Sequence, residues 1–417
     1  MPKKDPYQAL RFPEFRFYII ARFFITIAIS IQSVIIGWEI YSLTHDKLML
    51  GFIGLTEAIP AIGIAMYGGY VADKSEKRKL AILCYGSFAV LSAILILITH
   101  SSFVQFAGTQ KTVSLIFLII FLTGLARGFA GPASFSLSTF LIPKEAYLNG
   151  ATWSSSSWQL GAVIGPALGG LLYAAFGVTV TFSIQLALLI VATYFLSNIK
   201  PKPVVNPDNK EKIWDSVRMG LDFVFKNKII LSCISLDLFA VLFGGAVALL
   251  PVFAKDILLT GPTGLGMMRA APALGAIITL LILAYFPIRK HAGIKLLIAV
   301  FGFGLFIILF GISTSFIFSL FCLAMSGALD GISVAVRHTI IQLKTPPNMR
   351  GRVSAVNSMF IGSSNEIGEF ESGATARLMG TVPSVVFGGC MTCLVVLTTW
   401  FISPSVRKLE LKPEEQV

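Results

Sequence analysis

Long apolar segments follow one another along almost the whole chain, with short polar breaks between them. A bilayer core is about 30 Å thick, so a helix that crosses it needs roughly 20 mostly apolar residues. Segments of this kind leave no room for a sizeable soluble domain, and the pattern predicts an all-α membrane protein. The twelve predicted spans are 15–43, 48–72, 79–99, 112–139, 149–175, 178–197, 229–253, 264–287, 292–311, 315–343, 353–379 and 382–402.

Composition agrees with this class. Apolar residues make up 55% of the 417 residues and charged residues only 13%, whereas soluble domains carry about 25% charged residues. The mean hydropathy is +0.81. The first apolar stretch is longer than the core of a signal peptide and contains Arg22, so we expect no cleavable signal peptide.

The net charge of +12 is unevenly distributed between the two sides of the predicted spans. If the N-terminus is cytoplasmic, most of the Lys and Arg residues fall in cytoplasmic segments. These segments hold Lys3, Lys4, the basic residues of 74–79, the 198–228 connection, Arg289, Lys290, Arg350 and Arg352. Only Lys47, Lys111 and Lys255 fall in external loops. By the positive-inside rule both termini are predicted to be cytoplasmic, and the basic charge reports topology rather than a nucleic-acid partner.

The chain is predicted to consist of two similar halves, residues 1–197 and 229–417, joined by a polar linker at 198–228 whose second part resembles an interfacial amphipathic helix. Small residues, prolines and charges recur between the halves at constant offsets. The matched residues are Gly124, Arg127 and Gly128 with Gly327, Asp330 and Gly331, Gly165 and Gly170 with Gly368 and Gly373, and Gly54 and Pro60 with Gly266 and Pro272. Two six-helix halves around a midplane site are typical of major facilitator transporters.

A glycine, a carboxylate and a basic cluster meet where the second span ends. The predicted conformational gate comprises Gly69, Asp73, Lys74, Lys77 and Arg78, with Arg350 and Arg352 before the eleventh span. The segment resembles the G-x-L-A-D-R-x-G-R-K signature of the major facilitator superfamily, with Val71 for Leu, Lys74 for Arg and Glu76 for the internal Gly. This resemblance implies that Asp73 lies against the start of the eleventh helix.

The fifth span carries glycines at every fourth position, with a proline directly after the second of them and a further glycine after the third. These residues are Gly161, Gly165, Pro166, Gly169 and Gly170. Glycines at this spacing line one helix face and allow close packing, and a proline bends a helix. The pattern is similar to the superfamily's antiporter motif, which implies export; a purely structural small-residue face would have the same sequence.

The second half is similar to the branch of the superfamily that contains the enterobactin exporter and related efflux proteins. The similarity covers nearly the whole chain and is most specific at Asn365-Glu-Ile-Gly-Glu-Phe-Glu-Ser-Gly373. It implies a multi-pass protein of the inner cell membrane that acts as a monomer and exports a small, siderophore-like or amphipathic molecule. We expect the proton to be the coupling ion.

Charged residues inside the predicted spans are functional candidates, because a charge in hydrocarbon is costly unless it is paired or faces water. The candidates for a proton or substrate site are Arg22, Glu57, Arg127, Asp237, Arg269, Asp330, Arg337, Glu366, Glu369 and Glu371. Glu366 and Glu369 are three residues apart and lie on one helix face. Two carboxylates so close together in a low dielectric do not both ionise readily, which suits the binding and release of a proton. Arg127 and Asp330 occupy equivalent repeat positions and either face one another across a central cavity or pair locally, Asp330 then with Arg337.

No catalytic residue, metal or cofactor is expected. The sequence lacks a Walker motif, a zinc-ligand cluster and a convincing nucleophile elbow. Cys390 and Cys393 have metal-like spacing without further ligands nearby, and we interpret them as buried helix residues. The favoured function is a secondary active exporter. A proton-coupled importer of a polar nutrient and a membrane-embedded lipid-modifying enzyme remain as alternatives.

Overall fold

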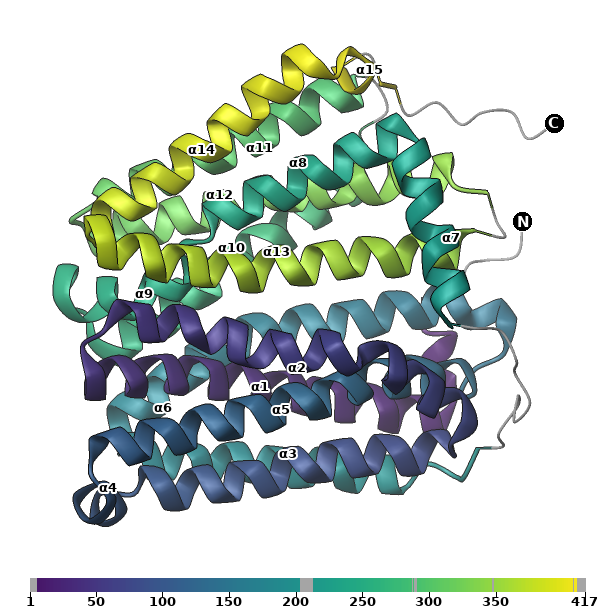
Figure 1. Ribbon diagram of the computed structural model, residues 1–417. Helices are drawn as coiled ribbons and strands as arrows, with labels where there is room; N and C mark the ends of the chain where they lie inside the picture. Colours follow the sequence, from purple (N-terminus) through teal and green to yellow (C-terminus); the bar gives the residue numbers. More distant parts are fainter. Residues whose placement is uncertain are drawn as a thin grey trace. The chain divides into compact units, whose positions relative to one another are not determined.

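The structure is a computed structural model that describes residues 6–202, 213–286, 288, 291–346, 349–407 and 409–410. Every regular element in these ranges is a helix (Figure 1). The elements are η1 (Ala9–Arg11), α1 (Pro13–Thr44), α2 (Lys47–Lys74), α3 (Lys77–Thr99), α4 (Ser101–Ala107), α5 (Thr109–Thr139), η2 (Lys144–Ala146), α6 (Tyr147–Ser197), α7 (Ile213–Lys226), α8 (Lys228–Gly244), η3 (Ala246–Leu249), α9 (Leu250–Val252), η4 (Phe253–Ile257), α10 (Gly261–Tyr285), α11 (Ala292–Ile312), α12 (Phe316–Lys344), α13 (Arg350–Met379), α14 (Thr381–Ile402) and α15 (Pro404–Arg407). The predicted all-α fold is confirmed.

Ten helices in the described ranges are long and apolar enough to cross a membrane, so the predicted count of twelve is not confirmed. Two elements account for the difference. The 51 residues of α6 would extend about 75 Å as one straight helix, far beyond the hydrocarbon thickness. At Gly177 the backbone leaves the helical region (φ 75°, ψ −179°), at the break that the sequence predicts. The other element is α13, which carries Glu366, Glu369 and Glu371 and is therefore less apolar than its neighbours.

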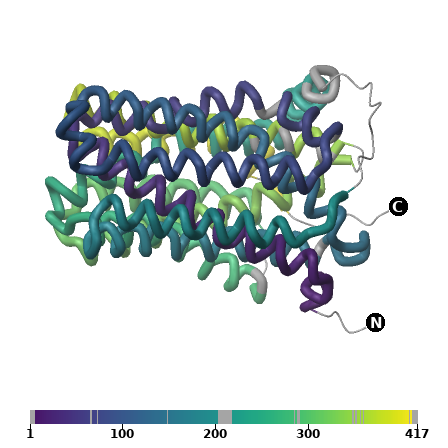
Figure 2. Tube along the Cα trace, turned by 90° about the horizontal axis from the view of Figure 1, so that it is seen from below, coloured from purple at the N-terminus to yellow at the C-terminus, as the bar shows by residue number. Residues whose placement is uncertain are grey.

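The first compact unit comprises residues Met1–His45, Thr56–Lys210 and Gly261–Ala270. Its helices α1, α3, α5 and α6 run side by side in both views (Figure 1, Figure 2). Phe15, Tyr18, Leu137 and Leu189 lie in an apolar core that these helices share. A buried amide pair crosses the same core, where Gln185 Nε2 donates to Gln32 Oε1 at 2.6 Å.

The second unit comprises Asp46–Leu55, Glu211–Thr260 and Ala271–Val417. Its core helices are α8, α11, α12, α13 and α14. Helix α7, predicted as an interfacial helix, buries Val224 completely against α8 and α13, while Phe225 remains exposed. In α14, Cys393 is partly exposed and Cys390 is exposed, so the interpretation of this pair as buried residues is wrong.

Each unit contains a short segment from the other half of the chain, which contacts Gly170 in unit 1 and Gly373 in unit 2, two glycines that the sequence repeat matches. In unit 1, a Cβ placed on Gly170 of α6 would lie 2.9 Å from Cα of Gly266 in α10. In unit 2, a Cβ placed on Gly373 of α13 would lie 2.8 Å from Cα of Gly51 in α2. These positions hold glycine because two helix backbones approach closely there.

Candidate functional site

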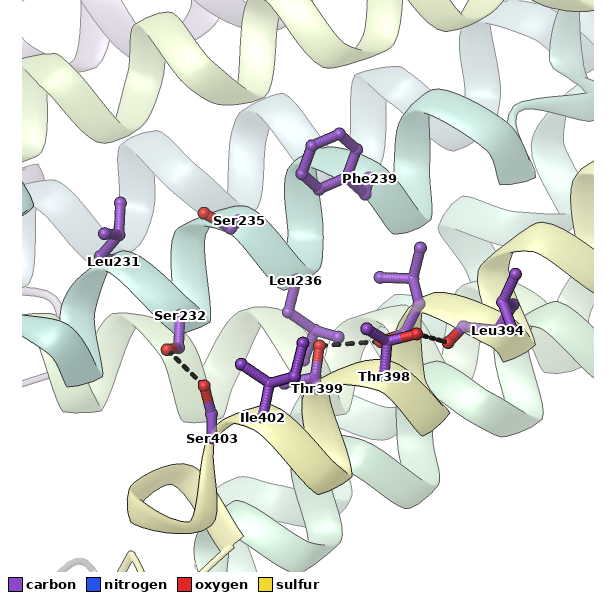
Figure 3. Close-up of a pocket in the computed structure, with 11 residues that line it drawn as sticks. Leu231, Ser232, Ser235, Leu236, Phe239, Leu394, Thr398, Thr399, Ile402 and Ser403 are labelled. Atoms are coloured by element: carbon purple, nitrogen blue, oxygen red, sulfur yellow. Dashed lines mark hydrogen bonds between the residues drawn. The ribbon is translucent and has the colours of Figure 1, made fainter.

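A cavity of about 440 Å³ lies in unit 2 between α8 and α14 (Figure 3). Aliphatic side chains and the hydroxyls of Ser232, Ser235, Thr398, Thr399 and Ser403 line it. These hydroxyls are largely satisfied inside the protein: Ser232 and Ser403 bond to each other at 3.0 Å, and the two threonines donate to carbonyls of α14. No charged residue lines this cavity in the described part of the chain, so it offers little to orient a polar substrate.

A larger cavity of about 570 Å³ lies in unit 1 between α1, α5 and α6, beside the connection from α5 to α6. It combines aromatic, hydroxyl-bearing and small residues with one arginine. The lining residues are Phe15, Tyr18, Arg22, Gly131, Ser134, Phe135, Ser138, Thr139, Ile142, Tyr147, Gly150, Ala151, Ser154, Ser155 and Trp158. The volume falls in the range typical of small-molecule sites, roughly 300–1,000 Å³.

Arg22 supplies the charge of this cavity. Its Nη1 donates to the hydroxyl of Tyr18 at 3.2 Å, and that hydroxyl lies 3.0 Å from Oγ of Ser134. The buried Nε of Arg22 has no hydrogen-bond partner among the described residues. Of the two tryptophans beside the serine run, Trp158 lines the cavity, whereas Trp153 donates to the carbonyl of Pro6 at 3.0 Å and anchors the N-terminal segment.

Glu57 and Arg127 form an ion pair between α2 and α5 in the same unit, with Nη1 and Oε1 2.6 Å apart. Both side chains are partly exposed, at 23% and 43%. Gly124 allows this approach, because an added Cβ would collide with the backbone of Glu57. Arg127 therefore has a local partner within its own unit.

Asp237 of α8 and Arg337 of α12 form a buried ion pair in unit 2, and each residue is only 4% exposed. Asp330, also on α12, interacts electrostatically with both members of the pair. Arg337 thus pairs directly with Asp237 and lies close enough to Asp330 to interact with it electrostatically. The sequence offered a local pairing of Asp330 with Arg337, whereas the ion pair in the structure joins Arg337 to Asp237 of α8.

The acidic residues of α13 have different surroundings. Oε2 of Glu369 would lie 2.7 Å from a Cβ on Gly54 of α2, so glycine makes room for this carboxylate. Glu371 is partly buried. Arg269 of α10 is in unit 1, where it donates to Oγ of Ser33 at 2.8 Å.

The predicted gate is tied to the start of the linker. Lys77 is buried and donates to the carbonyl of Ala72 at 2.5 Å, and Arg78 donates to the carbonyl of Ser197 at 2.6 Å. Lys74 lies over the ring of Tyr70, and Arg352 contacts the sulfur of Met219 at 3.5 Å. The side chains of Asp73 and Arg350 lie outside the described residues, as do Arg289 and Lys290.

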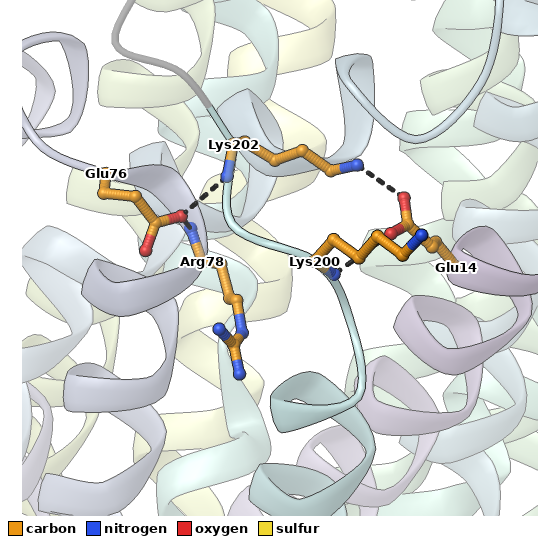
Figure 4. Close-up of polar contacts among 5 residues, drawn as sticks. All are labelled: Glu14, Glu76, Arg78, Lys200 and Lys202. Carbon is orange, nitrogen blue, oxygen red and sulfur yellow. Dashed lines mark hydrogen bonds and ion pairs between the residues drawn. The ribbon is translucent and has the colours of Figure 1, made fainter.

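Glu76 has a structural role that sequence reasoning missed (Figure 4). Its carboxylate caps α3 by accepting from the backbone N–H groups of Arg78 and Lys79, each at 2.9 Å. It also accepts from the backbone N–H of Lys202 at 3.0 Å, while Nζ of Lys202 bonds to Glu14 of α1 at 2.5 Å. The helix dipole favours an acidic residue at the start of a helix, and this pattern was the available signal.

Gly161, Gly165 and Gly169 of the antiporter-like motif lie on the face of α6 that packs against α1, whereas Gly170 packs against α10. A Cβ on Gly161 would lie 2.8 Å from Cβ of Thr26, and one on Gly165 would lie 2.6 Å from Cβ of Ser30. A Cβ on Gly169 would lie 3.2 Å from Cα of Ile31. In this structure the motif forms a tight seam between α6 and the helix that carries Arg22.

Known proteins resemble this chain over nearly its full length. The enterobactin exporter EntS of Salmonella typhi is 25% identical over 406 residues, which cover 96% of this chain and 95% of the exporter. EntS of Escherichia coli O1:K1 / APEC is 24% identical over 408 residues, or 97% and 95% of the two chains.

Solved transporters share the fold. The nucleoside transporter NupG superposes with a TM-score of 0.72 at 14% identity, covering 95% of this chain and 100% of NupG. A POT family transporter in complex with 5-aminolevulinic acid gives a TM-score of 0.71 at 14% identity, with 94% and 96% coverage. A profile described as transmembrane secretion effector, MFS_3, matches residues 4–416. With its helical membrane fold, its cavity and its repeat-matched helix contacts, the chain belongs to this family of major facilitator transporters.

Proposed function

We propose that the protein is a secondary active exporter that moves a small, siderophore-like or amphipathic molecule out of the cell by alternating access. The observation that carries the proposal is similarity to proteins named enterobactin exporters over 96% of the chain. The unit 1 cavity supports it, because its volume suits a small molecule. In the proposed topology both termini and the α5–α6 connection are cytoplasmic, so this cavity lies on the side from which an exporter loads.

We further propose that export is coupled to protons and that the acidic residues of unit 2 bind them. Asp237 pairs with Arg337 and Asp330 interacts electrostatically with it, so one carboxylate can take up a proton while the other continues to oppose the charge of the arginine. Glu366 and Glu369 on α13 are the other candidates. His338 directly follows Arg337 and is a further titratable residue, but its side chain is exposed and does not form part of the buried pair.

Transport direction and coupling are tested together in inverted membrane vesicles. Vesicles that contain the protein should accumulate enterobactin when their interior is acidified, and collapse of the pH gradient should stop accumulation. Uptake confined to right-side-out vesicles would show an importer instead. Accumulation that persists without the pH gradient would reject proton coupling.

The coupling site is tested with the amide variants Asp237→Asn, Asp330→Asn, Glu366→Gln and Glu369→Gln. The variant of the coupling residue should lose gradient-driven accumulation but retain exchange of labelled for unlabelled substrate without a gradient. Arg16→Gln serves as the control, because Arg16 is exposed on α1 in the other unit. If all four amide variants accumulate substrate like the parent, the proposed proton site is wrong.

A further inference from the structure

The unit 1 cavity has an unbalanced charge. Arg22 is the one charged residue among the described residues that line it, and no acidic side chain lies within ion-pair distance of its guanidinium in the described part of the chain. Other arginines in the predicted spans differ, since Arg127 pairs with Glu57 and Arg337 with Asp237. Among these three arginines of the described ranges, Arg22 is the one that combines a position in this cavity with neutral neighbours.

The neighbours of Arg22 hold it in place without neutralising it. The Tyr18 hydroxyl accepts one N–H and is itself bonded to Ser134, so this donor is fixed by two buried residues. An arginine has five N–H donors, and the bond from Arg22 to Tyr18 uses one of them. Its planar guanidinium is suited to bind a carboxylate or phosphate through two parallel hydrogen bonds. A charge in a membrane protein that lacks an internal counter-ion needs water or a ligand to stabilise it.

The other residues that line the cavity indicate what a ligand would carry besides an acidic group that binds Arg22. Trp158 is 52% exposed and Phe135 is 74% exposed, so both present ring surface that the protein leaves uncovered. Ser138, Thr139, Ser154 and Ser155 add neutral hydroxyls. Aromatic rings stack on flat substrates, and hydroxyls orient them without a charge requirement.

We propose that this cavity selects an anionic aromatic cargo, with Arg22 binding the acidic group and the Trp158 side of the cavity contacting the ring. This rests on the proposed function, since it names the substrate class of the proposed exporter. It also excludes cationic amphipathic compounds as preferred cargo, because a cation would meet the unneutralised charge of Arg22.

Two dyes with the same xanthene scaffold and opposite charge test the proposal. Fluorescein is anionic and rhodamine 123 is cationic. Fluorescence anisotropy with the purified full-length protein should give at least about tenfold tighter binding of fluorescein, as expected for one charge-assisted contact. Arg22→Gln should weaken fluorescein binding about tenfold or more, and Arg22→Lys should restore part of it.

Arg16→Gln is the matched control, because it removes the same charge from the same helix at an exposed position. It should bind fluorescein like the parent. Equal or tighter binding of rhodamine 123, or unchanged fluorescein binding in a monodisperse Arg22→Gln variant, would overturn the proposal. If Arg22→Gln does not fold, Arg22→Lys with the two dyes decides, since it must keep the preference for the anion. Binding is measured without a gradient, so a failure of export in vesicles would not affect this test. Conversely, the absence of a charge preference would contradict this inference but not the proposed export.

Discussion

Removing the charge of Arg337 should destabilise the protein more than removing either carboxylate beside it. Arg337 and Asp237 are each only 4% exposed and are directly paired, and Asp330 interacts with both. Removal of one partner from a buried pair costs about 3–5 kcal/mol, because the other charge is left uncompensated. Arg337→Gln leaves two carboxylates without their cation, so its cost should lie in this range.

The two carboxylates should differ. Asp237→Asn removes the direct partner of Arg337, but Asp330 still supplies an opposite charge, so we expect a loss of about 2–3 kcal/mol. Asp330→Asn leaves the direct pair intact and should cost about 1 kcal/mol or less. The expected order of destabilisation is therefore Arg337→Gln, then Asp237→Asn, then Asp330→Asn.

Reversible unfolding of the purified protein in mixed micelles of increasing denaturing-detergent fraction measures these differences, with Arg16→Gln as an exposed control. A double variant of Asp237→Asn with Arg337→Gln should cost clearly less than the sum of the two single variants, because the two residues interact directly. An Arg337→Gln variant as stable as the parent would refute the reasoning. So would an Asp330→Asn variant that loses more stability than Asp237→Asn.

Three further variants test the α1–α6 seam, the cap of α3 and the gate. Gly165→Ala places a Cβ 2.6 Å from that of Ser30 and should lower stability by about 1–3 kcal/mol, whereas Gly86→Ala, with no atom within 4 Å of the new Cβ, should be neutral or slightly stabilising in the same unfolding assay. Glu76→Ala removes the cap of α3 and should cost about 1 kcal/mol, with faster proteolysis at the start of the linker as a second readout. Asp73→Asn should slow transport while leaving equilibrium substrate affinity within about threefold; a collapse of binding would show that Asp73 contacts substrate instead.

The helical class could be predicted from the sequence because a bilayer imposes one length and one composition on every spanning helix. The break at Gly177 was predictable for the same reason, since an uninterrupted apolar segment of this length cannot fit one crossing. Helix α13 is harder to identify as a membrane span, because its glutamates lower the mean hydropathy by which spans are recognised. The buried face of α7 was not predicted, because an amphipathic pattern shows that a helix has an apolar face but not whether lipid or protein covers it.

The sequence could predict which charged residues belong to the candidate site, but not which residue each of them pairs with. Intramembrane charge marks Arg22, Arg127 and Arg337 equally, since the cost of placing each in hydrocarbon is similar. Two of the partners come from other helices, Glu57 for Arg127 and Asp237 for Arg337, and the third is the Tyr18 hydroxyl for Arg22. Only the last of these lies on the same helix as its arginine, so sequence spacing alone could have indicated it.

Their partners determine whether these arginines are available to bind a ligand. An arginine paired with a carboxylate is already neutralised, so a ligand anion must compete with that carboxylate before it can bind. Arg22 presents no such competitor, and its hydroxyl partner fixes the guanidinium without cancelling its charge. Anion binding should therefore depend on Arg22, whereas loss of Arg337 should act first through stability. An arginine variant that impairs transport in this protein can thus be interpreted only after binding and unfolding have been measured separately.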